Sequence, residues 1–122
     1  MAIKELLATY YEGLAQKKGW DTVLADDFKF VGADMTNTRP LVGKPAVIEV
    51  INRFSNLFKS MRVKDMIIEG ERASVRANYE FAFPNGKSVN GDVVELWYAK
   101  SGRLDTLTIF YDTATFAALS KD

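Results

Sequence analysis

The sequence predicts an α+β domain in which a curved antiparallel or mixed sheet wraps around N-terminal helices and leaves a cone-shaped apolar cavity. Apolar residues recur at helical spacing in the first half of the chain, whereas strand-like segments separated by turn residues fill most of the second half. Those strands are long for so small a sheet, and long twisted strands curl. All of residues 1–122 are expected to form this one domain.

The first half predicts three helices and one strand. Gly19 stops the first helix, Asp21 is a suitable cap for the second, and Pro45 suits the opening turn of the third. An apolar stripe carries the third helix on to Met61. The expected elements are a helix at 3–17, a short helix at 20–27 ("WDTVLADD"), a strand at 28–32 ("FKFVG"), a loop at 33–43 and a helix at 45–61.

The second half predicts strands that pair in sequence order. The segments are rich in Val, Ile, Thr, Tyr, Phe and Trp, and "EGE", "PNGK" and "KSG" interrupt them as turn signals. Asn85-Gly86 is the clearest hairpin turn, since both residue types accept a positive φ. Tight turns imply antiparallel pairing. The expected strands are 62–69, 72–83, 88–99 and 103–112, with a short helix after Asp112.

Composition excludes several classes of function. The 16 basic and 16 acidic residues balance, so no long-range field attracts nucleic acid or an anionic membrane. The chain has no cysteine and no histidine, which excludes disulfides, thiol nucleophiles, Cys/His zinc sites and histidine-based triads. We expect no metal and no cofactor. The opening "MAIKELLATYYEGL" mixes charges with apolar residues, unlike a signal peptide or a membrane span, so a cytoplasmic location is expected.

Two stretches carry a resemblance to a known family. "LADDFKFVGAD…G" and "KSGRLDTLTIFYD" resemble segments of the nuclear transport factor 2-like superfamily, and within it the SnoaL-like polyketide cyclases and ketosteroid isomerases. The resemblance covers nearly the whole chain. It implies a proton transfer beside a carbonyl group, as in an isomerase, cyclase or dehydratase, without a cofactor. The same fold also serves binding modules, so a cavity that holds a small apolar molecule without reacting it is the alternative.

The resemblance implies that Asp34 is the catalytic base. The family's base precedes a loop glycine by nine residues, and Asp34 stands at that distance from Gly43. A count that starts from "ADD" instead places Gly32 at the base position. The alternative for Asp34 is a solvated loop acid that hydrogen-bonds a nearby turn.

The resemblance also implies an oxyanion hole built from a tyrosine and an acid. Tyr10, four residues before Leu14, matches the family's tyrosine, and Tyr11 is its neighbouring alternative. Glu95 stands nearest to the family's acid, although glutamate replaces aspartate. Glu95 alternates with apolar residues on a strand whose two faces are both apolar. On the cavity side its pKa should rise through desolvation, and on the outside it is an ordinary carboxylate.

Further residues are expected to surround the ligand. Asp112 matches the acid that closes the family's last strand, but it is out of phase with Leu107, Ile109 and Tyr111, and it also suits the cap of the final helix. The residues expected at the ligand are Tyr11, Phe30, Phe54, Phe58, Trp97, Tyr111 and Asp112.

A third hypothesis concerns the outer face of the sheet. Arg76, Asn78 and Glu80 alternate with apolar residues and so lie opposite the predicted core. In a cavity they would resemble the water-activating sites of the superfamily's epoxide hydrolases; on the outside they form a solvated face or an interface. A homodimer through the outer sheet face, formed by Val94, Leu96 and Tyr98 or by the Arg76 face, is compatible with either the enzyme or the binding module.

Overall fold

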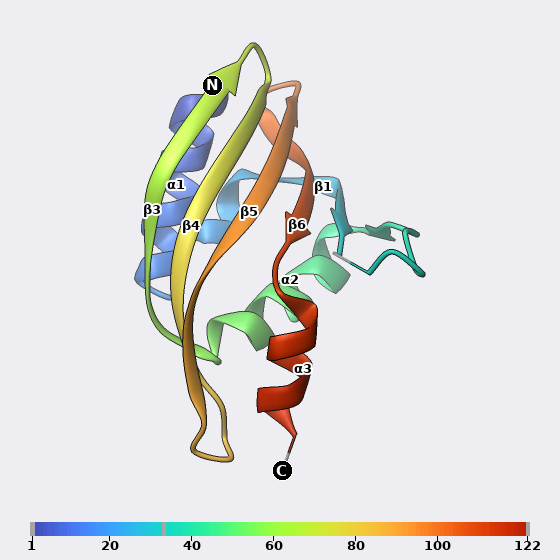
Figure 1. The fold of residues 1–122 in the computed structure, drawn as a ribbon. Coiled ribbons are helices and arrows are strands. Elements are labelled where there is room, and N and C mark those ends of the chain that lie inside the picture. Colours follow the sequence, from blue (N-terminus) through green and yellow to red (C-terminus); the bar gives the residue numbers. More distant parts are fainter. Residues whose placement is uncertain (1, 33, 122) are drawn as a thin grey trace.

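The computed structural model describes residues 2–32 and 34–121, and Figure 1 shows its helices set against a long, bent sheet. Across these residues, no helix is both long and apolar enough to cross a membrane. The elements in chain order are α1 (Ile3–Ala15), the 3-10 turn η1 (Trp20–Val23), β1 (Leu24–Val31), β2 (Leu41–Val42), α2 (Lys44–Ser55), β3 (Phe58–Glu69), β4 (Arg72–Ala82), β5 (Ser88–Lys100), β6 (Arg103–Phe110) and α3 (Thr113–Ser120).

The strands form one mixed sheet in the order β2-β1-β6-β5-β4-β3. β1 runs parallel to β6, and the other neighbouring strands are antiparallel. Figure 1 shows the long strands β3, β4 and β5 curving over α1 and α2, while α3 follows β6 at the lower end of the sheet. The predicted α+β class, with a curved mixed sheet around N-terminal helices, is confirmed.

The core lies between the inner face of the sheet and the first two helices. Leu6, Leu7 and Tyr10 of α1 are buried, and so are the odd-numbered residues of β4. In β5 the alternation continues: Val93, Glu95 and Trp97 point inward, whereas Val94, Leu96 and Tyr98 point outward. The strand pattern thus confirms the predicted alternation and puts Glu95 on the inner face.

The helix predicted for "WDTVLADD" is wrong beyond its first turn. Only Trp20–Val23 is helical, and Leu24 already pairs with Leu104 of β6. Pairing with a buried strand outweighs the weak local preference of a short segment for helix. Asp21 is not the cap, because the turn begins at Trp20 and its N-cap residue is Gly19, in a left-handed conformation (φ 85°) with no side-chain cap.

The third helix was predicted to reach Met61 but ends at Ser55. From Phe58 on, the chain is β3, with Phe58 opposite Phe81 of β4. The ammonium group of Lys17 holds this corner, because it donates to the carbonyl oxygens of Ser55 and Phe58 and lies 3.4 Å from the centroid of the Phe58 ring. A cation at the carbonyl end of a helix is favourable. Phe58 and Met61, the last apolar residues of the predicted stripe, therefore still face the core, although the backbone changes from helix to strand.

The loop predicted at 33–43 contains one more short strand. Leu41–Val42 pairs with Phe30 and Lys29 of β1 as the edge strand β2. Two residues carry too little pattern to predict a strand from sequence. The final helix begins after Asp112, as predicted.

Candidate functional site

A buried carboxyl group lies in the middle of the inner face of the sheet. Glu95 is 2% exposed, and its Oε1 accepts hydrogen bonds from the hydroxyls of Tyr11 (3.1 Å) and Tyr79 (3.2 Å). The Nε1–H of Trp97 in turn donates to the Tyr11 hydroxyl oxygen (2.9 Å). We call these four residues the Glu95 cluster. They join α1, β4 and β5 through side chains alone.

Strand register explains how the cluster forms. Val75 of β4 stands opposite Glu95 of β5, so Tyr79 comes four residues further along β4 on the same inner face. Phe58 and Phe81 hold the Tyr79 ring, edge-to-face at 5.1 Å and stacked at 5.5 Å between centroids. The Tyr79 hydroxyl is therefore directed to Glu95 by ring packing rather than by a flexible loop.

Burial changes the acid–base properties of the cluster. Desolvation raises the pKa of Glu95 from its ordinary 4.5 to about 7, although the hydrogen bonds from Tyr11 and Tyr79 act in the opposite direction. Burial, and then the nearby charge of Glu95, raises the pKa of Tyr10, Tyr11 and Tyr79 well above 10. At neutral pH the tyrosines are thus hydrogen-bond donors, while Glu95 exchanges readily between acid and carboxylate.

A small cavity of about 30 Å³ adjoins Glu95. Ligand pockets usually measure roughly 300–1,000 Å³, so this one is nearly closed. Six of the ten residues expected at the site line this cavity. Its lining is Tyr10, Leu14, Phe30, Ile51, Phe54, Phe58, Tyr79, Phe81, Val93, Glu95, Leu107, Ile109 and Tyr111.

Tyr11 and Trp97 are buried but belong to the hydrogen-bonded support of Glu95 rather than to the cavity lining. Of the two candidate tyrosines, Tyr11 makes the bond to Glu95, while Tyr10 lines the cavity and packs on Trp97 with centroids 4.7 Å apart. Adjacent helical residues point about 100° apart, which is why one reaches the carboxyl and the other the cavity.

Asp34 lies away from this cavity, exposed on the loop after β1. Its Oδ1 accepts from the backbone N–H (2.8 Å) and the hydroxyl (2.6 Å) of Thr36. These bonds lower the pKa of Asp34. Asp34 instead borders an open groove beside α3, together with Tyr111 and Phe116. Its assignment as a base stays a prediction.

Asp112 caps α3. Its Oδ1 accepts from the backbone N–H of Thr115 (3.0 Å) and its Oδ2 from the Thr115 hydroxyl (2.7 Å). The same bonds lower the pKa of Asp112. The capping interpretation is confirmed, and a contact of Asp112 with a ligand stays a prediction.

Tyr79 was not among the residues expected at the site. A signal for it did exist, because Tyr79 alternates with the apolar residues of its own strand, and pairing across the hairpin brings that face beside Glu95. The hairpin at Asn85-Gly86 would have set the register between them. The number of residues in the turn decides that register.

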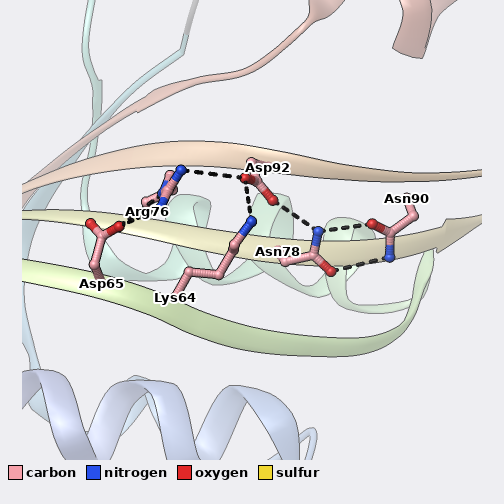
Figure 2. Close-up of polar contacts among 6 residues, drawn as sticks. All are labelled: Lys64, Asp65, Arg76, Asn78, Asn90 and Asp92. Carbon is pink, nitrogen blue, oxygen red and sulfur yellow. Dashed lines mark hydrogen bonds and ion pairs between the residues drawn. The ribbon is translucent and has the colours of Figure 1, made fainter.

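Arg76, Asn78 and Glu80 lie on the outer face of the sheet, away from the cavity. Figure 2 shows Arg76 between two acids, with its guanidinium 2.7 Å from Asp65 and 3.9 Å from Asp92. The neighbouring contacts in Figure 2 are Lys64 to Asp92 (2.9 Å), Asn78 to Asp92 (2.9 Å) and the amide pair Asn78–Asn90 (2.8 and 3.1 Å). Within residues 2–32 and 34–121, no three acidic side chains gather in a way that could hold a metal ion.

Comparisons with known proteins agree with this geometry. Residues 7–105 match the family described as a SnoaL-like domain, and curated protein sequences give no match. An NTF2-like protein of unknown function from Burkholderia pseudomallei is 23% identical, with 98% of each chain covered and a TM-score of 0.84. A protein from Jannaschia described as a SnoaL-like polyketide cyclase is 19% identical over 98% of this chain and 92% of its own, with a TM-score of 0.83. TerC, co-crystallised with polyporic acid, is 19% identical over 98% of each chain, with a TM-score of 0.82. At these identities the structures share the fold.

Proposed function

Because the chain belongs to the SnoaL-like domain family, we propose that its cavity binds a small, largely apolar carbonyl compound and that Glu95 transfers a proton within it. The observation that carries this proposal is the Glu95 cluster: a fully buried carboxyl group, with a pKa of about 7, held by two tyrosine hydroxyls at the edge of an aromatic cavity. A group whose pKa lies near the working pH is suited to act as both general acid and general base.

The hydrogen bonds suggest how the carboxyl group would work. Tyr11 and Tyr79 both donate to Oε1, which leaves Oε2 for the ligand. As a carboxylate, Glu95 would take a proton from the carbon beside the carbonyl and return it to another carbon, so each turnover restores the starting state. The Tyr10 hydroxyl would donate to the oxygen that becomes negative. Asp34 is exposed outside the cavity and has no step in this scheme.

The test is hydrogen–deuterium exchange at the carbon next to the carbonyl of small cyclic ketones, followed by NMR in deuterated buffer. We expect the natural chain to accelerate exchange and Glu95→Gln to slow it by about a hundredfold or more, since general acid–base groups contribute 10²–10⁴. Asp34→Asn is the matched control, an amide for an acid outside the cavity, and should keep most of the rate. Equal rates for Glu95→Gln and the natural chain would contradict the assignment of Glu95.

The alternative is a module that binds a small apolar molecule without reacting it. The apolar lining and the neighbour co-crystallised with polyporic acid support binding as such. Binding of a ketone without any exchange, and unchanged affinity in Glu95→Gln, would favour the module over the enzyme.

We also propose that the outer sheet face pairs two copies of the chain. Val94, Leu96, Tyr98 and Phe110 are between 37% and 49% exposed on adjoining strands. The ion pairs of Figure 2 lie on the same face and balance in sign, so the face can meet its own copy. Sedimentation at micromolar concentration should give a dimer that Leu96→Asp converts to a monomer. A monomeric natural chain would contradict the pairing.

A further inference from the structure

Two hollows meet near the last helix. One is the closed cavity at Glu95, of about 30 Å³, and the other is an open groove of about 730 Å³ along α3. Tyr111 lines both. The groove is otherwise lined by Asp34, Met35, Thr113, Ala114, Phe116, Ala117 and Ser120. The two spaces are therefore neighbours that share a wall.

The wall consists of aromatic rings. Phe116 of α3 lies 5.5 Å from Tyr111 and 5.7 Å from Phe54, and Phe54 and Tyr111 are 5.9 Å apart between centroids. All three side chains are half-buried. Phe116 also packs on Phe81 (5.4 Å) and Phe83 (5.1 Å), so opening the wall breaks four ring contacts, and the burial of an apolar ligand has to offset their loss.

The helix that carries Phe116 lies at the surface of the protein. None of the eight residues of α3 is fully buried. Its C-terminal end is held by Asn85 of the β4–β5 hairpin, whose Nδ2–H groups donate to the carbonyl oxygens of Leu119 (2.9 Å) and Lys121 (2.8 Å). The Oδ1 of Asn85 accepts from the backbone N–H of Lys87 (3.0 Å), which orients the amide. Segments with few buried contacts are the first to open.

We propose that the cavity and the groove are two parts of one ligand site, which joins when α3 and Phe116 move outward. This inference rests on the proposed binding function of the Glu95 cavity. The joined site takes an elongated, mostly apolar molecule. Its inner end carries a hydroxyl or carbonyl group for Glu95, and its outer end carries no anionic group, because Asp34 stands at the outer end as an anion.

The probe for a test is 2-naphthol, a flat neutral molecule with a hydroxyl at one end. Binding is followed by fluorescence, and its depth by the NMR signal of the Glu95 carboxyl carbon. In Phe116→Ala the association rate constant of the probe should rise about tenfold or more, because the four ring contacts of Phe116 no longer have to break. Binding of the probe should also shift the Glu95 signal. Leu119→Ala truncates a half-buried side chain of the same helix outside the wall and should behave like the natural chain.

Asn85→Asp tests the helix while the ring wall stays intact. The substitution replaces the donor group with an acceptor that faces two carbonyl oxygens, so the probe should again associate faster. The control is Asn52→Asp on the exposed side of α2, which should leave the association rate of the probe unchanged. Three results would overturn the joined site: equal rates in Phe116→Ala and Leu119→Ala, a bound probe that leaves the Glu95 signal unmoved, or no binding to Phe116→Ala at millimolar probe. None of these measurements depends on turnover. A negative result in the exchange assay would therefore contradict the proposed proton transfer without contradicting the joined site.

Discussion

Replacing Glu95 with glutamine should remove most of the pH dependence of the free energy of unfolding between about pH 5 and 8. The pKa of Glu95 is about 7 in the folded protein and lies near 4.5 once the chain is unfolded. Between these values the folded state binds more protons than the unfolded state, so stability falls as the pH rises. For a fully buried group the loss is on the order of 3 kcal/mol and is complete above about pH 7.

Chemical denaturation at several pH values measures this difference. The chain contains no histidine and no cysteine, whose ordinary pKa values lie nearest to this range, and every other titrating group is common to both proteins. Glutamine keeps an oxygen that accepts from Tyr11 and Tyr79, so the variant should be the more stable protein at pH 8. A natural chain whose stability is flat from pH 5 to 8 would contradict a buried, protonated Glu95.

Replacing Gly13 with alanine should destabilise the fold by about 2 kcal/mol. A Cβ at Gly13 would lie 2.5 Å from the backbone nitrogen of Trp20 and 2.8 Å from the carbonyl oxygen of Lys18. Both atoms belong to the backbone and cannot rotate away. Overpacking costs about 1–3 kcal/mol and occasionally more, and the better helix propensity of alanine offsets about 1 kcal/mol.

The close approach at Gly13 matters to the site because it positions Trp20 against α1. Trp20 packs on Tyr10 with ring centroids 6.3 Å apart, and the same helix carries Tyr11. Gly91 is the matched control: nothing lies within 4 Å of a Cβ there, and alanine in a strand interior is neutral or slightly stabilising. Thermal unfolding of both variants gives the comparison. Equal stabilities for Gly13→Ala and Gly91→Ala would contradict the close contact between α1 at Gly13 and the backbone of η1 at Trp20.

Much of the fold follows from patterns that span many residues. The alternation in β4 repeats often enough to fix its two faces, and it predicted correctly that Arg76 points outward. β5 is apolar on both faces, so its alternation left the side of Glu95 open. The errors lie where a short segment obtains its structure from distant partners. Leu24 is a strand residue because Leu104 lies beside it, and Phe58 because Phe81 does. No local pattern contains that information.

The candidate site was predictable only in part, for a related reason. Glu95 is a candidate from sequence because a charged residue in an apolar strand is unusual, and such a pattern indicates burial. The rotation of α1 and the strand register decide which tyrosines hydrogen-bond to Glu95. They bring Tyr11 and Tyr79 to its carboxyl group and leave Tyr10 in the cavity lining. The size of the cavity depends on how Phe54, Tyr111 and Phe116 pack, which side-chain type and spacing do not determine.

The most direct test of the account is an NMR titration of the Glu95 carboxyl carbon in the free protein, assigned with Glu95→Gln. We expect a pKa of about 7. Tyr79→Phe should raise that pKa further, because the Tyr79 hydroxyl stabilises the carboxylate. A midpoint near 4.5, unchanged by Tyr79→Phe, would mean that Glu95 is a solvated carboxylate, and the proposed proton transfer would lose its physical basis.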